Sequence, residues 1–168
     1  MAFERLYHAA FPKVYAFVRC QVSSVETAQD VVSRIFVKAY RNRLHQPNAE
    51  ATMAWIFRIA RTTLIDYWRV EKRRDAVTQP LDAMAELTSQ AEDPEAAYER
   101  KERGARVVRA VNGLKDDDRI LLAMKFAGQR TNREIAAILR ISDAAVSMRL
   151  LRALRLLRAT LDGDRGER

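Results

Sequence analysis

The sequence predicts an all-α fold: two small helical domains joined by a flexible acidic linker, the C-terminal one a helix-turn-helix domain. Three observations support this prediction. Apolar residues recur at helical spacing in both halves of the chain. The 168 residues are 48% apolar with only 5 Gly and 4 Pro, which suits a packed helical core. Acidic and basic residues also divide the chain into three unequal parts.

The charge distribution sets the expected domain boundaries. Residues 1–74 carry a net charge of +7 and residues 100–168 carry +8, while residues 75–99 carry −7 and no basic residue. The acidic stretch contains Pro80 and Pro94 and has little sustained periodicity, so we expect a mostly extended or disordered linker. A purely solubilising role for this linker fits as well as a specific one.

Three helices are expected in the first domain, at about residues 3–19, 25–43 and 53–74. Pro12 lies inside the first helix and should kink or break it. Thr52 directly precedes the third helix and is its expected N-cap.

The third helix ends in a cationic cluster beside two aromatic residues, Tyr67 and Trp68. Cations stabilise the negative end of a helix dipole. The same arrangement could hold a nucleic-acid backbone while the aromatic rings stack on bases. The residues alone leave both interpretations open. The cluster consists of Arg69, Lys72, Arg73 and Arg74.

The C-terminal domain contains the pattern of a helix-turn-helix. Thr131 and Glu134 form a capping box that starts its first helix, and residues 140–142 supply a tight turn. Ser142 or Asp143 can cap the second helix. Apolar residues of the second helix share one buried face because they recur at i, i+4, i+7 and i+11. They are Val146, Leu150, Ala153 and Leu157.

The second helix of this motif is basic outside its apolar face. A helix-turn-helix places such a helix in the DNA major groove, and a net charge of +8 with a pI near 10.1 favours a polyanionic partner. An ordinary amphipathic helix with a solvated cationic face would show the same pattern. The arginines concerned are Arg149, Arg152, Arg155 and Arg158.

The sequence does not favour catalysis, a metal site or a cofactor. It has no glycine-rich phosphate loop, its single cysteine is Cys20, and His8 and His45 lie far apart. The acidic triplet at residues 116–118 fits the first turn of a helix better than a metal site. No apolar run approaches the ~20 residues of a membrane span, and the N-terminus lacks a signal-peptide core. We therefore expect a cytoplasmic protein without membrane insertion.

Four segments together resemble the extracytoplasmic-function (ECF) sigma factors, the compact sigma subunits of bacterial RNA polymerase. FERLYHAAFPKVYAFVR looks like the family's opening helix, and QDVVSRIFVKAY resembles its core-binding helix. WIFRIARTTLIDYWRVEKRR is similar to its promoter-melting helix. GLKDDDRILLAMKFAGQRTNREIAAILRISDAAVSMRLLRALRLLR resembles the domain that reads the −35 element. The order and spacing of the segments, and the linker between them, carry the resemblance.

This resemblance implies a sigma factor, not an enzyme, that binds core RNA polymerase and directs promoter-specific transcription initiation on promoter DNA. Residues 1–74 would be region 2, for core binding and for recognition and melting of the −10 element. Residues 100–168 would be region 4, for recognition of the −35 element. The acidic linker would follow polymerase channels that otherwise take nucleic acid.

The resemblance also assigns roles to individual side chains. The core-polymerase surface would include Asp30, Arg34 and Phe36. The −10 element would be bound by Arg58, Arg61, Thr62, Arg69, Lys72, Arg73 and Arg74. The −35 element would be bound by Ser142, Asp143, Ser147, Arg149 and Arg152. Arginine can pair with guanine in the major groove or with phosphate.

Three positions depart from the family's usual pattern. Thr62 replaces an Asn, which alters the expected readout of the −10 base. Arg140 replaces a Gly before the recognition helix and must adopt the turn geometry at some cost. The core-binding helix has Gln29-Asp30 where Glu-Asp is usual and Ser33 where Gln is usual, so it lacks one negative charge.

The missing charge motivates a hypothesis of control by phosphorylation, because a phosphate adds about −1.5 to −2 charges. The alternative is a neutral change for which the polymerase compensates. The regulator would accordingly be an anti-sigma protein or a Ser/Thr kinase. Candidate hydroxyls are those of Ser23, Ser24, Thr27, Ser33 and Thr52.

Two other functions remain open from the sequence. A stand-alone helix-turn-helix regulator that binds an operator as a dimer would explain the C-terminal half but give residues 1–74 no role. An adaptor protein fits the acidic linker but not the two basic blocks. For the free sigma factor, we expect weak promoter binding because the two domains are not held at promoter spacing without polymerase.

Overall fold

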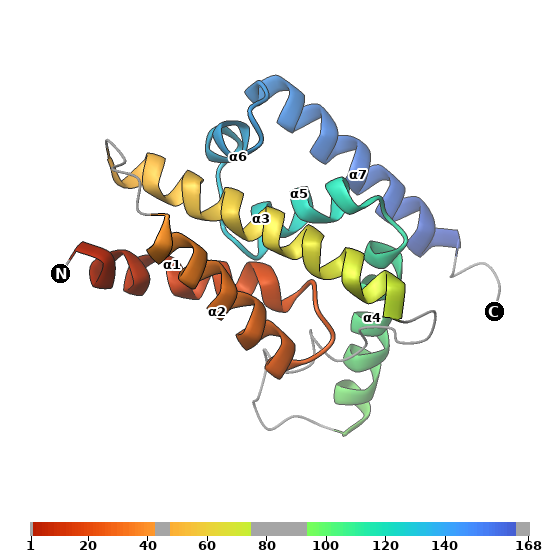
Figure 1. Ribbon diagram of the computed structural model, residues 1–168. Coiled ribbons are helices and arrows are strands. Elements are labelled where there is room, and N and C mark those ends of the chain that lie inside the picture. Colours follow the sequence, from red (N-terminus) through yellow and green to blue (C-terminus); the bar gives the residue numbers. More distant parts are fainter. Residues whose placement is uncertain (1, 43–47, 75–93, 164–168) are drawn as a thin grey trace.

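The computed structural model describes residues 2–42, 48–74 and 94–163 (Figure 1). These residues form seven α-helices and no strand, which confirms the predicted all-α class. The helices are α1 (Ala2–Arg19), α2 (Val25–Arg41), α3 (Ala49–Arg74), α4 (Pro94–Asn112), α5 (Asp116–Phe126), α6 (Asn132–Leu139) and α7 (Asp143–Gly163). None of these helices is long and apolar enough to cross a membrane.

The first three helices pack into one bundle, as the sequence predicts. Helix α2 contacts both α1 and α3, and Phe17 and Phe57 meet between α1 and α3 with ring centroids 5.5 Å apart. The rings of Phe3 on α1 and Tyr40 on α2 meet edge to face, with their centroids 5.2 Å apart. Helix α1 continues through Pro12, so the expected break does not occur.

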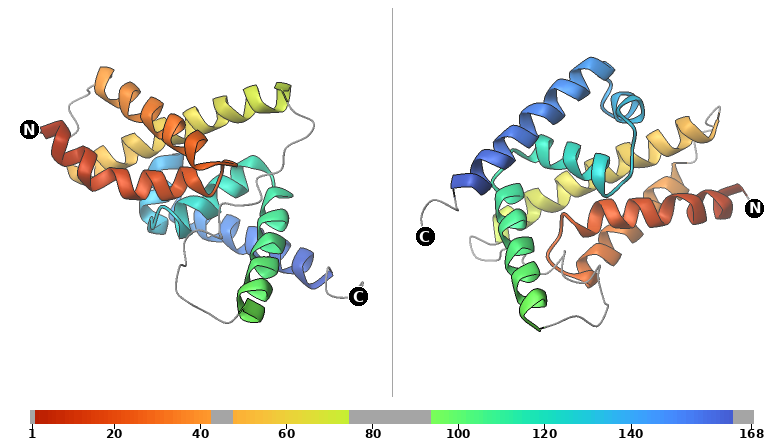
Figure 2. Two further views of the ribbon diagram at one scale, coloured as in Figure 1. Left: turned by 90° about the horizontal axis from the view of Figure 1, so that it is seen from below. Right: turned by 180° about the vertical axis from the view of Figure 1, so that it is seen from behind.

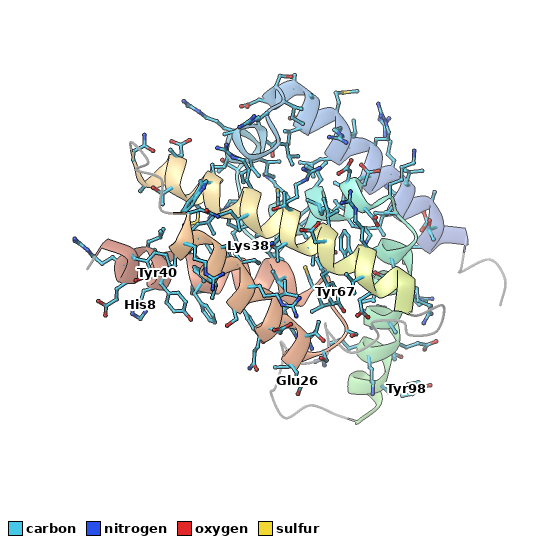
Figure 3. The ribbon with its side chains drawn as sticks, viewed as in Figure 1. His8, Glu26, Lys38, Tyr40, Tyr67 and Tyr98 are labelled. Atoms are coloured by element: carbon cyan, nitrogen blue, oxygen red, sulfur yellow. The ribbon has the colours of Figure 1, made fainter. Side chains whose placement is uncertain are left out.

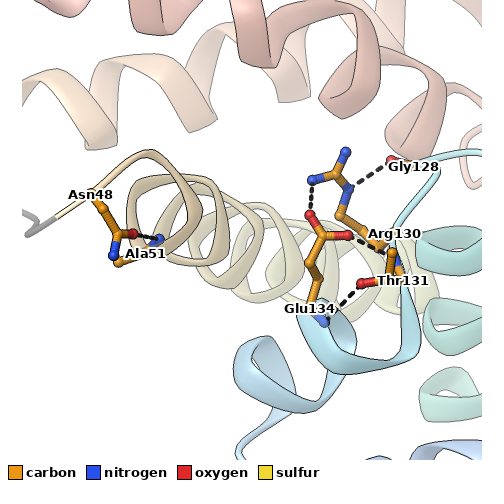
Figure 4. A network of polar contacts seen from close by, with 6 residues as sticks. All are labelled: Asn48, Ala51, Gly128, Arg130, Thr131 and Glu134. Carbon is orange, nitrogen blue, oxygen red and sulfur yellow. Dashed lines mark hydrogen bonds and ion pairs between the residues drawn. The ribbon is translucent and has the colours of Figure 1, made fainter.

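Helix α3 begins earlier than predicted because Asn48 caps it. The side-chain oxygen of Asn48 accepts a hydrogen bond from the Ala51 N–H at 2.8 Å (Figure 4). Thr52 therefore lies in the first turn, where its hydroxyl donates to the Asn48 carbonyl oxygen at 2.7 Å. The prediction of Thr52 as N-cap was wrong.

The helix-turn-helix is confirmed in helices α6 and α7. Thr131 and Glu134 form both hydrogen bonds of the capping box. Arg140 ends α6 in the left-handed conformation with φ 57°, the costly geometry expected where glycine is usual. The hydroxyl of Ser142 then accepts a hydrogen bond from the Ala145 N–H at 3.1 Å, which caps α7.

Helix α4 extends into the stretch predicted as linker. It starts at Pro94, so the expectation of extended chain was wrong for residues 94–99. Proline suits the first position of a helix because it has no N–H to leave unpaired there. The helix packs against α7 (Figure 2). Residues 75–93 of the predicted linker lie outside the described residues.

The two helical halves share one continuous hydrophobic core, a contact that the sequence did not predict. Helix α3 lies between α2 on one side and α6 on the other (Figures 1 and 2). Phe57 and Leu64 are fully buried on α3, and Ile135 is fully buried on α6. The C-terminal domain is therefore held against the helix that carries the −10 candidates.

Arg130, a charged residue, is buried where α6 meets α3. Its side chain is 5% exposed and donates to the Gly128 carbonyl oxygen at 2.9 Å and to Glu134 at 2.7 Å (Figure 4). Partial burial tends to raise the pKa of Glu134. Hydrogen bonds from Thr131 and the charge of Arg130 outweigh it, so the pKa lies below its usual range.

This network predicts pH-dependent stability. Because the pKa of Glu134 is lowered in the folded state, its carboxylate stabilises the fold above the usual pKa of 4.5, and this contribution is lost as pH falls through the folded value. We expect Glu134→Gln to lower the free energy of unfolding by about 1–2 kcal/mol at pH 7. Denaturant titrations should show the difference shrinking below pH 4.5.

The exposed first-turn acid Glu4 of α1 provides a control. Glu4→Gln should change the free energy of unfolding by only ~0.3 kcal/mol, both at pH 7 and at about pH 3. A Glu134→Gln effect that is constant from pH 7 to about pH 3 would contradict the role given to the ionised carboxylate.

Candidate nucleic-acid interface

One face of α3 carries three of the predicted −10 residues. Arg58, Thr62 and Arg69 lie at i, i+4 and i+11 and therefore share a side of the helix. The Arg69 side chain is 72% exposed, with Asp66 at 3.8 Å. Arg58 is half-buried, and the exposed Thr62 donates its hydroxyl hydrogen toward the carbonyl oxygens of Arg58 and Ile59. Arg69 is thus more accessible than Arg58.

Arg61 lies on the adjacent side of α3, which faces the C-terminal domain. Its side chain is 34% exposed, and its guanidinium forms an ion pair with Asp117 of α5 at 3.0 Å. Arg61 is thus engaged within the molecule. The backbones of Lys72, Arg73 and Arg74 end α3, but their side chains lie outside the described residues.

Trp68 is not free to stack on a base in this structure. Its side chain is 7% exposed, and its indole N–H donates to the Gln21 carbonyl oxygen at 3.3 Å. The guanidinium of Arg119 from α5 lies 4.5 Å from the ring centroid. Tyr67 is half-buried and lies along the groove between α2 and α3 (Figure 3). The base-stacking interpretation therefore fails for Trp68 in this arrangement.

The predicted −35 residues gather at the N-terminal half of α7. Ser142, Asp143, Ser147 and Arg152 are exposed there, and Arg149 is half-buried. The hydroxyl of Ser147 accepts a hydrogen bond from the Asn132 side chain at 2.9 Å, which ties α6 to α7. The helix thus presents hydroxyl, carboxylate and guanidinium groups outside its buried stripe, as a groove-reading helix requires.

Two apolar residues of this surface were missed from the sequence. Met148 and Leu151 are 58% and 43% exposed on α7. Their positions outside the buried stripe of Val146 and Leu150 were the available signal. Apolar side chains of this kind can contact the thymine methyl group in the major groove.

The predicted core-polymerase residues divide between surface and interior. Asp30 and Arg34 form an exposed ion pair at 2.6 Å on α2. Phe36 is only 6% exposed, with its ring centroid 4.7 Å from that of Tyr7 and 6.1 Å from that of Phe11. Phe36 therefore supports the bundle from inside and offers little contact area.

A groove between α2 and α3 brings together most of the candidate hydroxyls. It has a volume of about 820 Å³ and includes Asp30 and Arg34 in its lining. Ser24 caps α2, since its hydroxyl accepts from the Thr27 N–H at 3.1 Å. Thr52 does not line this groove and lies on the first turn of α3. The candidate hydroxyls that line it are those of Ser23, Thr27 and Ser33.

Comparison with known proteins decides the family. Residues 6–74 match the Sigma-70 region 2 family, and residues 105–157 match the Sigma-70, region 4 family. The ECF RNA polymerase sigma factor RpoE of Cereibacter sphaeroides is 32% identical over 161 residues, covering 94% of this chain and 84% of that protein. The chain belongs to the ECF sigma factor family. SigM, an ECF sigma factor of Bacillus subtilis, is 27% identical over 160 residues. The aligned part covers 95% of this sigma factor and 94% of SigM.

Solved structures show that the whole fold of this sigma factor recurs. RpoE of Bartonella quintana, in complex with the anti-sigma factor NepR, superposes with a TM-score of 0.70 at 21% identity, covering 96% of this chain and 97% of RpoE. CnrH in complex with the cytosolic domain of CnrY superposes with a TM-score of 0.66 at 23% identity, covering 97% of this chain and 89% of CnrH. The fold shared with both includes regions 2 and 4.

Proposed function

We propose that this sigma factor binds core RNA polymerase and directs promoter-specific transcription initiation. Region 2, residues 1–74, would bind core and recognise and melt the −10 element, and region 4, residues 100–168, would read the −35 element. One observation carries the proposal: two family matches in this order coincide with a basic face on α3 and a polar, arginine-bearing face on α7. The protein would act in the cytoplasm as a DNA-binding initiation factor without enzymatic activity of its own.

A dimeric helix-turn-helix regulator accounts for less of the molecule. It would use α6 and α7 but leave the region 2 match over residues 6–74 without a purpose. Proteins of the same fold were solved with the anti-sigma factor NepR and with the cytosolic domain of CnrY, so an anti-sigma protein is one proposed regulator. A Ser/Thr kinase is the other.

Region 4 readout can be tested by reconstituted transcription. We expect Arg149→Ala and Arg152→Ala each to reduce transcript yield about tenfold, because an arginine contact to a base is worth about 1–3 kcal/mol. The assay uses core polymerase with the full chain on a library of genomic DNA fragments, with transcript ends sequenced.

Arg103 of α4 provides the matched control, because its exposed side chain pairs with Glu99 at 3.2 Å and is not among the DNA-binding candidates. Arg103→Ala removes the same charge and should retain near-normal yield. If the chain added to core directs no specific start sites at all, the sigma-factor function itself is excluded.

Ser33 is the best-placed hydroxyl for control by phosphorylation. It is exposed on α2 and lines the same groove as Asp30 and Arg34. Ser24 is engaged as a helix cap, and Thr52 donates to a backbone carbonyl. A negative charge at Ser33 would replace the one missing from this surface.

We therefore expect Ser33→Asp to bind core polymerase about threefold tighter than Ser33→Asn, which has nearly the same shape without the charge. Titration of a fluorescently labelled sigma factor with core at low and high salt measures this difference. The gain should disappear at high salt. Equal affinities of the two variants at low salt would contradict the prediction that a negative charge at Ser33 strengthens binding to core polymerase. If phosphate at none of the candidate hydroxyls changes this affinity, kinase control through this surface is excluded.

A further inference from the structure

A chain of polar side chains joins three helices of region 4. Lys125, near the end of α5, donates from its ammonium group to the side-chain oxygen of Asn132 at 2.8 Å. Asn132 is the first residue of α6, and its side-chain nitrogen donates to the hydroxyl oxygen of Ser147 on α7 at 2.9 Å. The chain therefore ends on a side chain of the predicted −35 set.

The ammonium group fixes the direction of each hydrogen bond in this chain. An ammonium group can only donate, so it must face the oxygen of the Asn132 amide. The amide can then present only its NH2 group to Ser147, whose oxygen has to accept. A bond from a charged donor also polarises the amide and strengthens the bond that it makes next. The oxygen of Ser147 is thereby held in place from the protein side.

The hydroxyl hydrogen of Ser147 is left to act outside the protein. A serine hydroxyl has one hydrogen and two lone pairs, and Asn132 occupies one lone pair. Within the described part of the chain, no acceptor takes the hydrogen. Thr62 and Thr160 differ, because their hydroxyls donate to carbonyl oxygens of their own helices. The exposed Ser147 thus offers a hydrogen-bond donor on a fixed oxygen.

Apolar side chains lie beside this hydroxyl on the outer face of α7. Successive residues of a helix are about 100° apart, so Ser147, Met148 and Leu151 fall within about one third of a turn. All three side chains are exposed. The outer face therefore combines one hydrogen-bond donor with apolar surface.

Thymine is the base that matches this combination. In the major groove it presents an acceptor, O4, next to a methyl group. Guanine and adenine present acceptors without a methyl group, and cytosine presents a donor, its N4 amine. A donor facing cytosine would leave its own hydrogen unpaired, which costs more than an unused lone pair.

We propose that Lys125 and Asn132 hold Ser147 as a hydrogen-bond donor that reads a thymine of the −35 element, while Met148 and Leu151 cover the thymine methyl group. This inference rests on the proposed function, because it takes region 4 as the reader of that element. Lys125 and Asn132 are positioning residues, since they act on DNA through Ser147. The direction of the hydrogen bonds, and with it the preferred base, is set by a lysine that does not touch DNA.

Asn132→Asp tests the direction of the chain with almost no change of shape. A carboxylate can only accept, so it takes a hydrogen bond from Lys125 and another from the Ser147 hydroxyl. Ser147 then has only lone pairs for the groove and should favour a base with an amino group, cytosine or adenine. Gln129→Glu is the matched control, because it makes the same change of charge on an exposed side chain of the turn before α6.

Base preference can be measured by transcription from a promoter library. Core polymerase with the full chain transcribes copies of one selected promoter whose −35 element is randomised, and the productive templates are sequenced. The unmodified chain and Gln129→Glu should prefer thymine over cytosine about tenfold at one position. Asn132→Asp should move that preference about tenfold toward cytosine or adenine, and Ser147→Ala should reduce it to about threefold, the part due to the methyl contact. Ratios within one library cancel a uniform loss of DNA affinity.

The proposal is overturned if no position prefers thymine, if Asn132→Asp and Gln129→Glu show the same preferences throughout, or if Ser147→Ala leaves them unchanged. If Asn132→Asp yields no transcript, Lys125→Met decides, because it frees the Asn132 amide to turn over. Lys125→Met should lower the thymine preference to about threefold, and an unchanged preference overturns the proposal. If the unmodified chain directs no specific start sites, the sigma-factor function itself is excluded.

Discussion

The structure depends on the burial of α3 from two sides. This helix carries large side chains on opposite flanks, and a helix that is apolar on two sides must be covered on both. Helices α1 and α2 cover one flank, while α6 and the turn before it cover the other around Phe57. Helix α3 is thereby the centre of the molecule, and the position of region 4 follows from its packing against that helix.

This packing explains why charged residues occupy the junction. Arg119 and Arg130 lie on aromatic rings of α3, where a guanidinium can stack on a ring and still direct its N–H groups to oxygens at the edge. These contacts place polar groups within the hydrophobic core that joins the two halves, where Phe57 and Ile135 are fully buried.

Local signals in the sequence predicted the elements well. The capping box of Thr131 and Glu134, the left-handed Arg140 and most of the buried stripe of α7 follow from short-range spacing, which a sequence displays directly. Leu157 was predicted in that stripe but is only half-buried. Thr52 was misassigned as a cap because Asn48 competes for the same role one turn earlier. The start of helix α4, residues 94–99, was assigned to the linker because its acidic composition outweighed a weak helical pattern.

Long-range contacts could not be predicted in the same way. Arg61, Arg119 and Arg130 are charged, and charge in a sequence normally indicates exposure. Their partners Asp117, Trp68 and Phe57 lie more than fifty residues away in sequence. The sequence therefore predicted the candidate residues of α3 and of α7 as two separate sets. The contact between region 4 and α3 became visible only in the folded structure.

Small-angle X-ray scattering of the free full-length chain tests the central claim most directly. If region 4 rests on α3, the 168 residues should scatter as one compact body with a radius of gyration of about 15 Å and a single maximum in the distance distribution. A radius of gyration above roughly 20 Å, with a second maximum from two separated domains, would contradict the packing of region 4 on α3.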